Sequence, residues 1–182
     1  WLCGFTLYLR CIVHGYRDNI RGRGWVDDFQ SADARQLHRE VVITRHATAL
    51  DVDALVQCVV DFAAVSYPND KPDRRHITGV VLGAMDSDHS LVAVLEDDAG
   101  KVAGCYLGTQ IQNMISGAPT AVEILFYVSP TYRGHGGKLL SFAEQWAEDQ
   151  GCKSMFLSCP ATAPRAGKYF EAKGYTLTEC HY

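Results

Sequence analysis

The stretch "YVSPTYRGHGGKLL", residues 127–140, combines groups that could bind a phosphorylated ligand. Gly134, Gly136 and Gly137 can adopt backbone conformations closed to other residues, so main-chain N–H groups can approach a ligand closely. A strand that ends at the proline and a helix that begins after the glycines would place unpaired N–H groups and a positive dipole end at this corner. Arg133 adds a full positive charge. The spacing predicts an anion site suited to a phosphate or pyrophosphate.

Two common phosphate-binding motifs are absent from the sequence. No G-x-x-x-x-G-K-[ST] stretch occurs, which excludes a Walker P-loop. Gly134 and Gly136 are not followed by the third glycine of a dinucleotide-binding G-x-G-x-x-G. Taken alone, the corner fits a plain strand-to-helix turn with an unused arginine as well as it fits a binding site.

The elements around this corner follow from hydrophobic periodicity and turn residues. Strand patterns cover residues 40–47, 90–97, 101–110, 121–129, 153–159 and 175–182. Helix patterns cover residues 48–66, 74–87, 138–150 and 164–173. The order β-α-α-β-β-β-α-β-α-β predicts one α/β domain with a mixed sheet, over residues 39–182. Residues 1–38 show little periodicity and are expected to form a poorly ordered N-terminal extension.

Composition limits the classes of function. The chain has 182 residues, 47% of them hydrophobic, and a net charge of −4, which suits one globular domain and gives no reason to expect a nucleic-acid partner. No apolar run approaches the ~20 residues of a membrane span, so no membrane partner is expected. Seven cysteines show neither C-x-x-C nor Cys/His metal spacing. We therefore expect no metal and a reducing, cytoplasmic location.

The corner sequence resembles the acyl-CoA-binding motif of the GNAT superfamily of N-acetyltransferases, [Q/R]-x-x-G-x-[G/A] between a strand and a helix. Arg133 matches the first position of the motif and Gly136 the fourth, whereas Lys138 replaces the small residue of the sixth. The resemblance extends from about residue 41 to 181 and includes the element order and the segment "PRAGKYFEAKGY". It implies a GNAT-like, mostly antiparallel mixed sheet flanked by helices.

The resemblance also implies a function: direct transfer of an acetyl group from acetyl-CoA to an amine, within a ternary complex. The acceptor would be a small molecule or a peptide, and homodimers are common in the family. An open strand edge would pair with the pantetheine arm, and an N–H near Val128 would polarise the thioester. The implied CoA contacts are Phe126, Tyr127 and Val128 on the strand, and Arg133, Gly134, His135, Gly136, Gly137 and Lys138 at the corner.

Glu123 is the candidate general base. It interrupts an otherwise apolar strand, and a desolvated carboxylate there would have a raised pKa, as a base requires. Simple alternation places Glu123, Leu125 and Tyr127 on one face of the strand and Ile124 on the other. A solvent-facing glutamate at the start of a strand explains the residue equally well.

Tyr169 is the candidate general acid. Many GNAT members carry a tyrosine at the second aromatic position of this helix, but here the order is Tyr169–Phe170. Tyr169 would therefore replace the usual acid, or pack against CoA while water relays protons.

The acceptor is less well defined. Residues 40–182 carry a charge of −6, which mildly favours a cationic acceptor, and the loops at 64–76 and 110–120 are expected to select it. Phe170 and Lys138 keep a second reading open, a non-catalytic acyl-CoA-binding or interaction module. The third interpretation is a different strand-loop-helix phosphate binder, such as an enzyme that acts on nucleotides.

Overall fold

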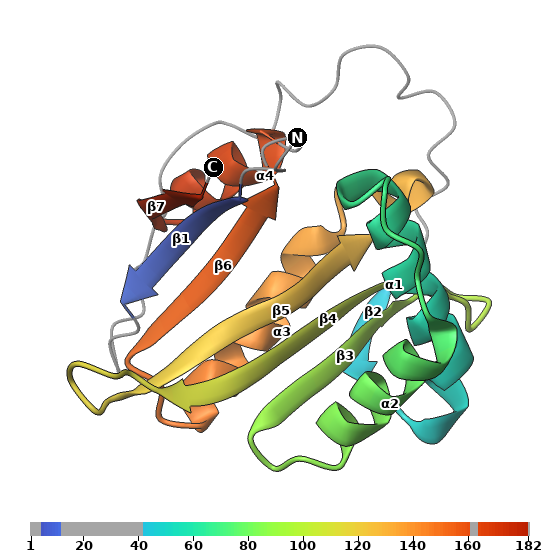
Figure 1. Cartoon of the computed structure of the whole chain (residues 1–182), viewed down its shortest axis with the longest axis horizontal. Helices are drawn as coiled ribbons and strands as arrows, with labels where there is room; N and C mark the ends of the chain where they lie inside the picture. The colour runs from blue at the N-terminus through green and yellow to red at the C-terminus, as the bar shows by residue number, and fades with distance from the viewer. Residues whose placement is uncertain (1–4, 12–41, 161–163, 182) are drawn as a thin grey trace.

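The computed structural model describes residues 5–11, 42–160 and 164–181, and a seven-stranded sheet runs through them (Figure 1). The strand order is β2-β3-β4-β5-β6-β1-β7. Among the described strands, β5 and β6 form the one parallel pair, and the other neighbours are antiparallel. The mixed, mostly antiparallel α/β fold is therefore confirmed. The strands are β1 (Phe5–Cys11), β2 (Ile43–His46), β3 (Ser90–Glu96), β4 (Val102–Gln112), β5 (Pro119–Val128), β6 (Ser154–Pro160) and β7 (Thr176–His181).

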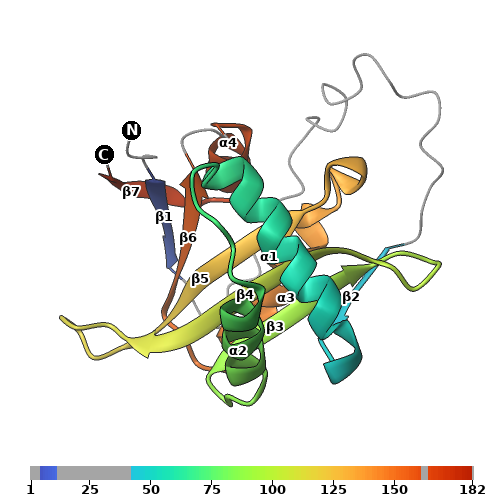
Figure 2. The same cartoon turned by 45° about the vertical axis from the view of Figure 1, so that its right-hand side comes forward.

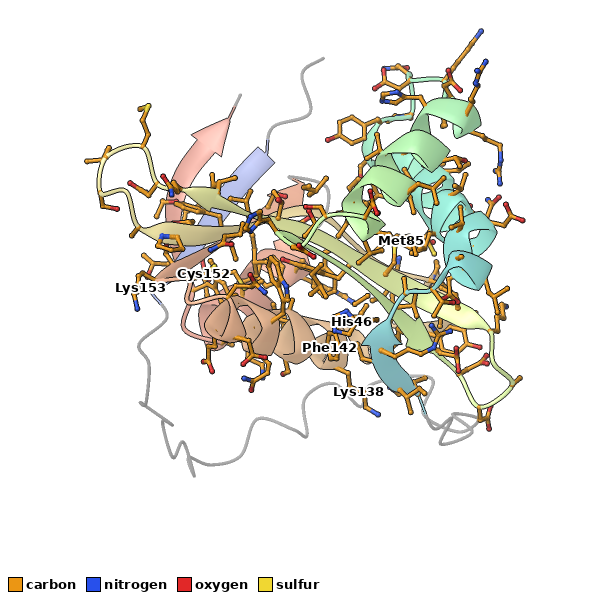
Figure 3. The ribbon with its side chains drawn as sticks, turned by 90° about the horizontal axis from the view of Figure 1, so that it is seen from below. His46, Met85, Lys138, Phe142, Cys152 and Lys153 are labelled. Carbon is orange, nitrogen blue, oxygen red and sulfur yellow. The ribbon has the colours of Figure 1, made fainter. Side chains whose placement is uncertain are left out.

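Helices cover both faces of the sheet. On one face, α1 (Val52–Ser66) packs on β4 and β5, and α2 (Arg74–Met85) packs on β3 (Figure 2). On the other face, α3 (Gly136–Asp149) contacts β2 through β5. The last helix, α4 (Pro164–Ala172), packs against β6, β1 and β7. Figure 3 shows the sheet between these two layers.

The amphipathic pattern of α3 explains its position. Its buried residues recur at helical spacing, so they form one apolar stripe that faces the sheet. Gly151, with φ of +72°, lies just beyond the end of the helix, where a left-handed residue is favoured. The buried residues of this stripe are Leu139, Leu140, Ala143, Trp146 and Ala147.

The structure contains the ten expected elements in the expected order and adds one more. Residues Phe5–Cys11, which we expected to lie in an unstructured extension, form β1 and pair with both β6 and β7. This segment is apolar without alternation, so periodicity gave no signal, and its partners lie at the other end of the chain. The rest of the proposed extension lies outside the described residues, and its boundary at residue 38 stays a prediction.

An ion-pair network ties the start of α1 to the sheet. The Arg45 guanidinium on β2 donates to both carboxylate oxygens of Asp51, at 2.7 and 2.9 Å, and through Nε to Glu96 on β3 at 2.8 Å. Asp51 also accepts the N–H of Thr48 at 2.7 Å. The hydrogen bonds from Arg45 lower the pKa of Asp51 from 3.8 to about 2, although burial opposes them.

This lowered pKa means that the Asp51 carboxylate stabilises the fold above its unfolded pKa, near pH 4, and loses this effect as the pH falls toward 2. We expect Asp51→Asn to lower the free energy of unfolding by about 2 kcal/mol at pH 7, because a pKa unit corresponds to about 1.4 kcal/mol. Urea denaturation between pH 7 and pH 3 measures this, with exposed Asp88→Asn as the control. The difference in stability between the two variants should narrow as the pH falls toward 3. A constant difference across the range would contradict the assignment.

Candidate active site

Strand β5 loses its β6 partner partway along its length. Pairing with β6 runs from Thr120 to Val122 and stops there, whereas pairing with β4 continues to Val128. Beyond Val122 the two strands diverge, which Figure 1 shows as β6 turning away from β5. The expected open edge at Phe126–Val128 is therefore confirmed.

A β-bulge lies where this divergence begins. Leu107 on β4 pairs with Leu125, and Gly108 pairs with Glu123, so Ile124 is left without a cross-strand partner. The prediction that Ile124 and Leu125 lie on opposite faces of the strand is therefore wrong, because an inserted residue breaks the alternation. Both side chains line one cavity on the α1–α2 face of the sheet.

The Glu123 carboxylate spans the divergence between the strands. Its Oε2 accepts the Ser158 N–H at 2.8 Å and the Ser158 hydroxyl at 2.7 Å. Ser158 lies on β6 beyond the last residue that pairs with β5. The carboxylate therefore accepts the Ser158 N–H, which has lost the chance to pair with the main chain of β5 because the two strands diverge. Within the described residues, Oε1 has no hydrogen bond and stays available to accept a proton.

Burial makes this carboxylate suitable for proton transfer. Glu123 is 9% exposed, and desolvation raises its pKa from 4.5 to about 7, against the opposing effect of the two Ser158 bonds. The expected rise in pKa is confirmed, and the role as base stays a prediction. A surface position for Glu123 is excluded by the same burial.

Two neighbours of Glu123 were missed by the sequence analysis. Ser158 carried no local signal, because its contact with Glu123 depends on the register between two strands. Tyr106 on β4 is fully buried, and within the described part of the chain its hydroxyl has no hydrogen-bond partner. Burial and then the charge of Glu123 raise the pKa of Tyr106. In the sequence, Tyr106 is one apolar strand residue among several.

The glycine corner follows directly after β5. A 3-10 turn covers Pro130–Tyr132, Gly134 has φ of +103°, and α3 begins at Gly136. The N–H of His135 donates to Tyr132 at 3.2 Å, and that of Lys138 donates to His135 at 3.0 Å. Among the described residues, the corner N–H groups that have no hydrogen-bond partner are those of Arg133, Gly134, Gly136 and Gly137.

Both glycines at the start of α3 lie close to neighbouring side chains, and a Cβ at Gly137 would require the Tyr169 hydroxyl to move. A Cβ at Gly136 would lie 3.4 Å from the Phe126 ring and 3.5 Å from Val128, and a Cβ at Gly137 would lie 2.8 Å from the Tyr169 hydroxyl. The first turn of α3 therefore rests against the open end of β5. The Tyr132 hydroxyl also donates to Asp97 at 2.5 Å, which ties the corner to the β3–β4 turn.

Lys138 directs its ammonium away from the corner. Its Nζ donates to the carbonyl of Val42 at 2.6 Å, beside the start of β2, and Figure 3 shows the side chain at this end of α3. Its amide is already used within the turn. The exposed Arg133 side chain is therefore the cation best placed at the corner, and a contact between Lys138 and CoA stays a prediction.

The two candidate proton-transfer residues lie apart. The Tyr169 hydroxyl lies against Gly137 at the start of α3, and burial raises its pKa. Phe170 is 2% exposed and stacks on Phe126, with ring centroids 6.3 Å apart. Among the described residues no contact joins Tyr169 to Glu123, so the structure brings Glu123 and Ser158 together but not Glu123 and Tyr169.

The described residues contain neither a metal-binding cluster nor a helix that could span a membrane. No group of three or more His, Cys, Asp or Glu side chains there could hold a metal ion. None of the helices in those residues is both long enough and apolar enough to cross a bilayer.

The described sheet is mixed and opens beside its central strand, and a glycine-rich corner follows the end of that strand. The sequence model of the Acetyltransferase (GNAT) family matches residues 56–175, and the chain belongs to this family. Members of the family are acetyl-CoA-dependent N-acetyltransferases. No curated protein sequence matches the chain.

Solved structures share the fold at low sequence identity. Aminoglycoside N-acetyltransferase AAC(6')-Iy in complex with CoA is similar with a TM-score of 0.65 at 15% identity, over 77% of this chain and 91% of that one. Glucosamine-6-phosphate N-acetyltransferase from Arabidopsis thaliana gives 0.63 at 14% identity, over 77% and 95%. A transcriptional regulator from Bacillus halodurans C-125 gives 0.67 at 17% identity, over 76% and 95%.

Gly134 offers a test of the corner as an anion site. Alanine at φ of +103° is strained, so Gly134→Ala should turn the neighbouring N–H groups and weaken CoA binding about tenfold, the equivalent of one lost hydrogen bond. Gly100→Ala is the matched control, because it also has positive φ, at +79°, and open space around it. Calorimetric titration with CoA measures both variants. Equal affinity in the two would contradict the assignment.

Proposed function

We propose that this chain is an N-acetyltransferase that moves an acetyl group from acetyl-CoA directly to an amine in a ternary complex. The observation that supports this most strongly is the edge of β5 that is unpaired within the described part of the chain, where it leads into a corner with four free main-chain donors. Acetyl-CoA supplies the acyl group as an activated thioester. Direct attack by the amine needs no enzyme nucleophile.

Residues at the corner would bind the pyrophosphate of acetyl-CoA. The free N–H groups of Arg133, Gly134, Gly136 and Gly137 and the guanidinium of Arg133 provide donors and positive charge. The half-buried His135 would flank this site. The open edge at Phe126, Tyr127 and Val128 would hydrogen-bond the amides of the pantetheine arm, as an added strand does.

The Val128 N–H is suited to polarise the thioester carbonyl. The next residue, Ser129, donates its N–H to Ala103 at 2.9 Å, at the end of the β4–β5 pairing. Main-chain N–H groups alternate in direction along a strand, so the Val128 N–H points to the open edge instead. A donor fixed in this position stabilises charge on an oxyanion without further reorganisation.

Glu123 would take the proton that the acceptor ammonium must lose. Its free Oε1 can accept the proton, while Ser158 holds Oε2 and so orients the carboxyl group. A pKa of about 7 balances ionisation against proton affinity near neutral pH. Tyr169 stays the candidate acid for the CoA thiolate, and its hydroxyl at the start of α3 suits a CoA contact equally well.

The second candidate function is an acyl-CoA-binding module without turnover. The observation that favours it is Phe170, which fills the usual acid position with a ring buried against Phe126. Calorimetry with acetyl-CoA followed by a thiol-release assay over a panel of amines separates the two. Enzymatic function requires binding and release of CoA thiol with at least one amine. Binding without release favours the module, and absence of binding contradicts both.

Glu123→Gln tests the base. The amide keeps an acceptor oxygen for Ser158 but cannot take a proton, so we expect kcat/KM to fall by roughly 10²- to 10⁴-fold. In the unsubstituted protein kcat/KM should rise with pH through about 7, as Glu123 ionises, and the variant should lose this rise. Glu148→Gln, on the exposed side of α3, is the control. An unchanged pH–rate profile would remove Glu123 from this role.

A further inference from the structure

A partly open cavity lies on the α1–α2 face of the sheet, beside the bulge in β5. It has a volume of about 310 Å³, and its floor includes Ile124 and Leu125, the two residues that follow Glu123. An amine whose body occupied this cavity would have its nitrogen near the divergence of β5 and β6. The cavity is therefore placed to hold the acceptor, an inference that rests on the proposed function.

The walls of the cavity are mostly apolar, with polar atoms from Tyr67, His76 and Tyr106. Leu107 and Leu125 on the sheet are almost fully buried, so they form a fixed surface. Half-buried side chains from both helices complete the enclosure, and Phe62 packs edge-on against Tyr67 with ring centroids 6.0 Å apart. Among the residues that the structure describes, no aspartate, glutamate, lysine or arginine lines the cavity. The helix residues that line it are Leu55, Val59, Phe62 and Ala63 of α1 and His76, Ile77, Val80 and Val81 of α2.

The carboxylates close in sequence to these walls have other partners. Asp61 on α1 accepts the side-chain amide of Gln57 at 2.7 Å. Asp73 caps α2 by accepting the N–H groups of Arg75 and His76, at 2.9 and 3.2 Å. A polycationic acceptor requires several carboxylates, because a desolvated ammonium without a partner is costly to bury. Within the described residues, the cavity walls therefore offer no carboxylate to a polycation.

The volume limits the size of the acceptor. A cavity of 310 Å³ lies at the lower end of the range for small-molecule sites, and holds roughly the volume of ten waters. One aromatic ring or one branched alkyl group on a short amine fits this space. A multi-ring aminosugar is larger and far more polar.

We infer that the acceptor is a small primary amine with a single aromatic or branched aliphatic body, such as an arylalkylamine. The body is buried against α1, α2 and the bulge, and the amine nitrogen faces the open edge of β5. The small size and mostly apolar walls of the cavity select against aminosugars, although similar folds include aminoglycoside N-acetyltransferases.

The test compares amines by thiol release at saturating acetyl-CoA. We expect kcat/KM for 2-phenylethylamine to exceed that for glucosamine and ethanolamine by at least tenfold, and to rise severalfold with each methylene from propylamine to hexylamine, as burial of apolar groups requires. Release with the polar amines alone would overturn this inference and leave the proposed function standing. If none of the amines causes release of CoA thiol, both the inference and the proposed function are overturned.

Adjacent alanines provide matched variants. Ala63 lines the cavity, and Ala64 is exposed on α1. Ala63→Trp should raise KM for 2-phenylethylamine at least tenfold and leave KM for acetyl-CoA unchanged, whereas Ala64→Trp should change neither. Equal effects of the two substitutions would overturn the inference.

A surface substitution covers the case in which Ala63→Trp fails to fold. Val80 lines the cavity but is 44% exposed, so Val80→Asp adds a carboxylate at little cost to the core. We expect it to reduce the preference for hexylamine over 1,4-diaminobutane at least fivefold, and Leu82→Asp, at 47% exposure outside the cavity, to leave the preference intact. An unaltered preference with Val80→Asp would contradict the cavity as acceptor site.

Discussion

The candidate site depends on one constraint, the loss of pairing between β5 and β6 after Val122. A strand inside a sheet normally has both edges bonded, and main-chain groups without partners are costly to bury. Here the free-energy cost of the unpaired main-chain groups is reduced because a side chain replaces one partner and because the strand edge is left open. Glu123 satisfies the Ser158 N–H across the divergence, and the free end of β5 remains available to a ligand with amide groups. One break in a ladder thus produces both a strand edge and a buried carboxylate.

The bulge at Ile124 links the two faces of the sheet. By inserting a residue opposite Leu107 and Gly108, it separates Glu123 from the regular alternation and brings Ile124 beside Leu125. The carboxylate then lies between the strands, while the adjacent side chains form the floor of the α1–α2 cavity. The buried carboxylate and the cavity floor therefore come from the same short stretch of β5.

Sequence patterns predicted the parts of the fold that local physics determines. The short apolar runs of β3 to β6, the apolar stripe of α3 and the turn glycines are all properties of short windows, and these elements were predicted correctly. The glycine corner was recognisable because its residues are consecutive. Ser158, the bulge and β1 were missed, because each depends on strand register between distant segments. The side-chain direction of Lys138 was missed for the same reason, since its partner Val42 lies far away in the chain.

The position of β1 also bears on how the molecule assembles. The first strand in the chain pairs with β6, where Phe5 lies opposite Pro160, and with β7, where Phe5 lies opposite His181. During synthesis this strand must wait for nearly the whole chain to emerge before either neighbour exists. Such non-local pairing is slow to form, and an apolar strand that waits with both edges bare is prone to pair with other chains. Efficient folding of this protein would then depend on how the ribosome and chaperones shield Phe5–Cys11.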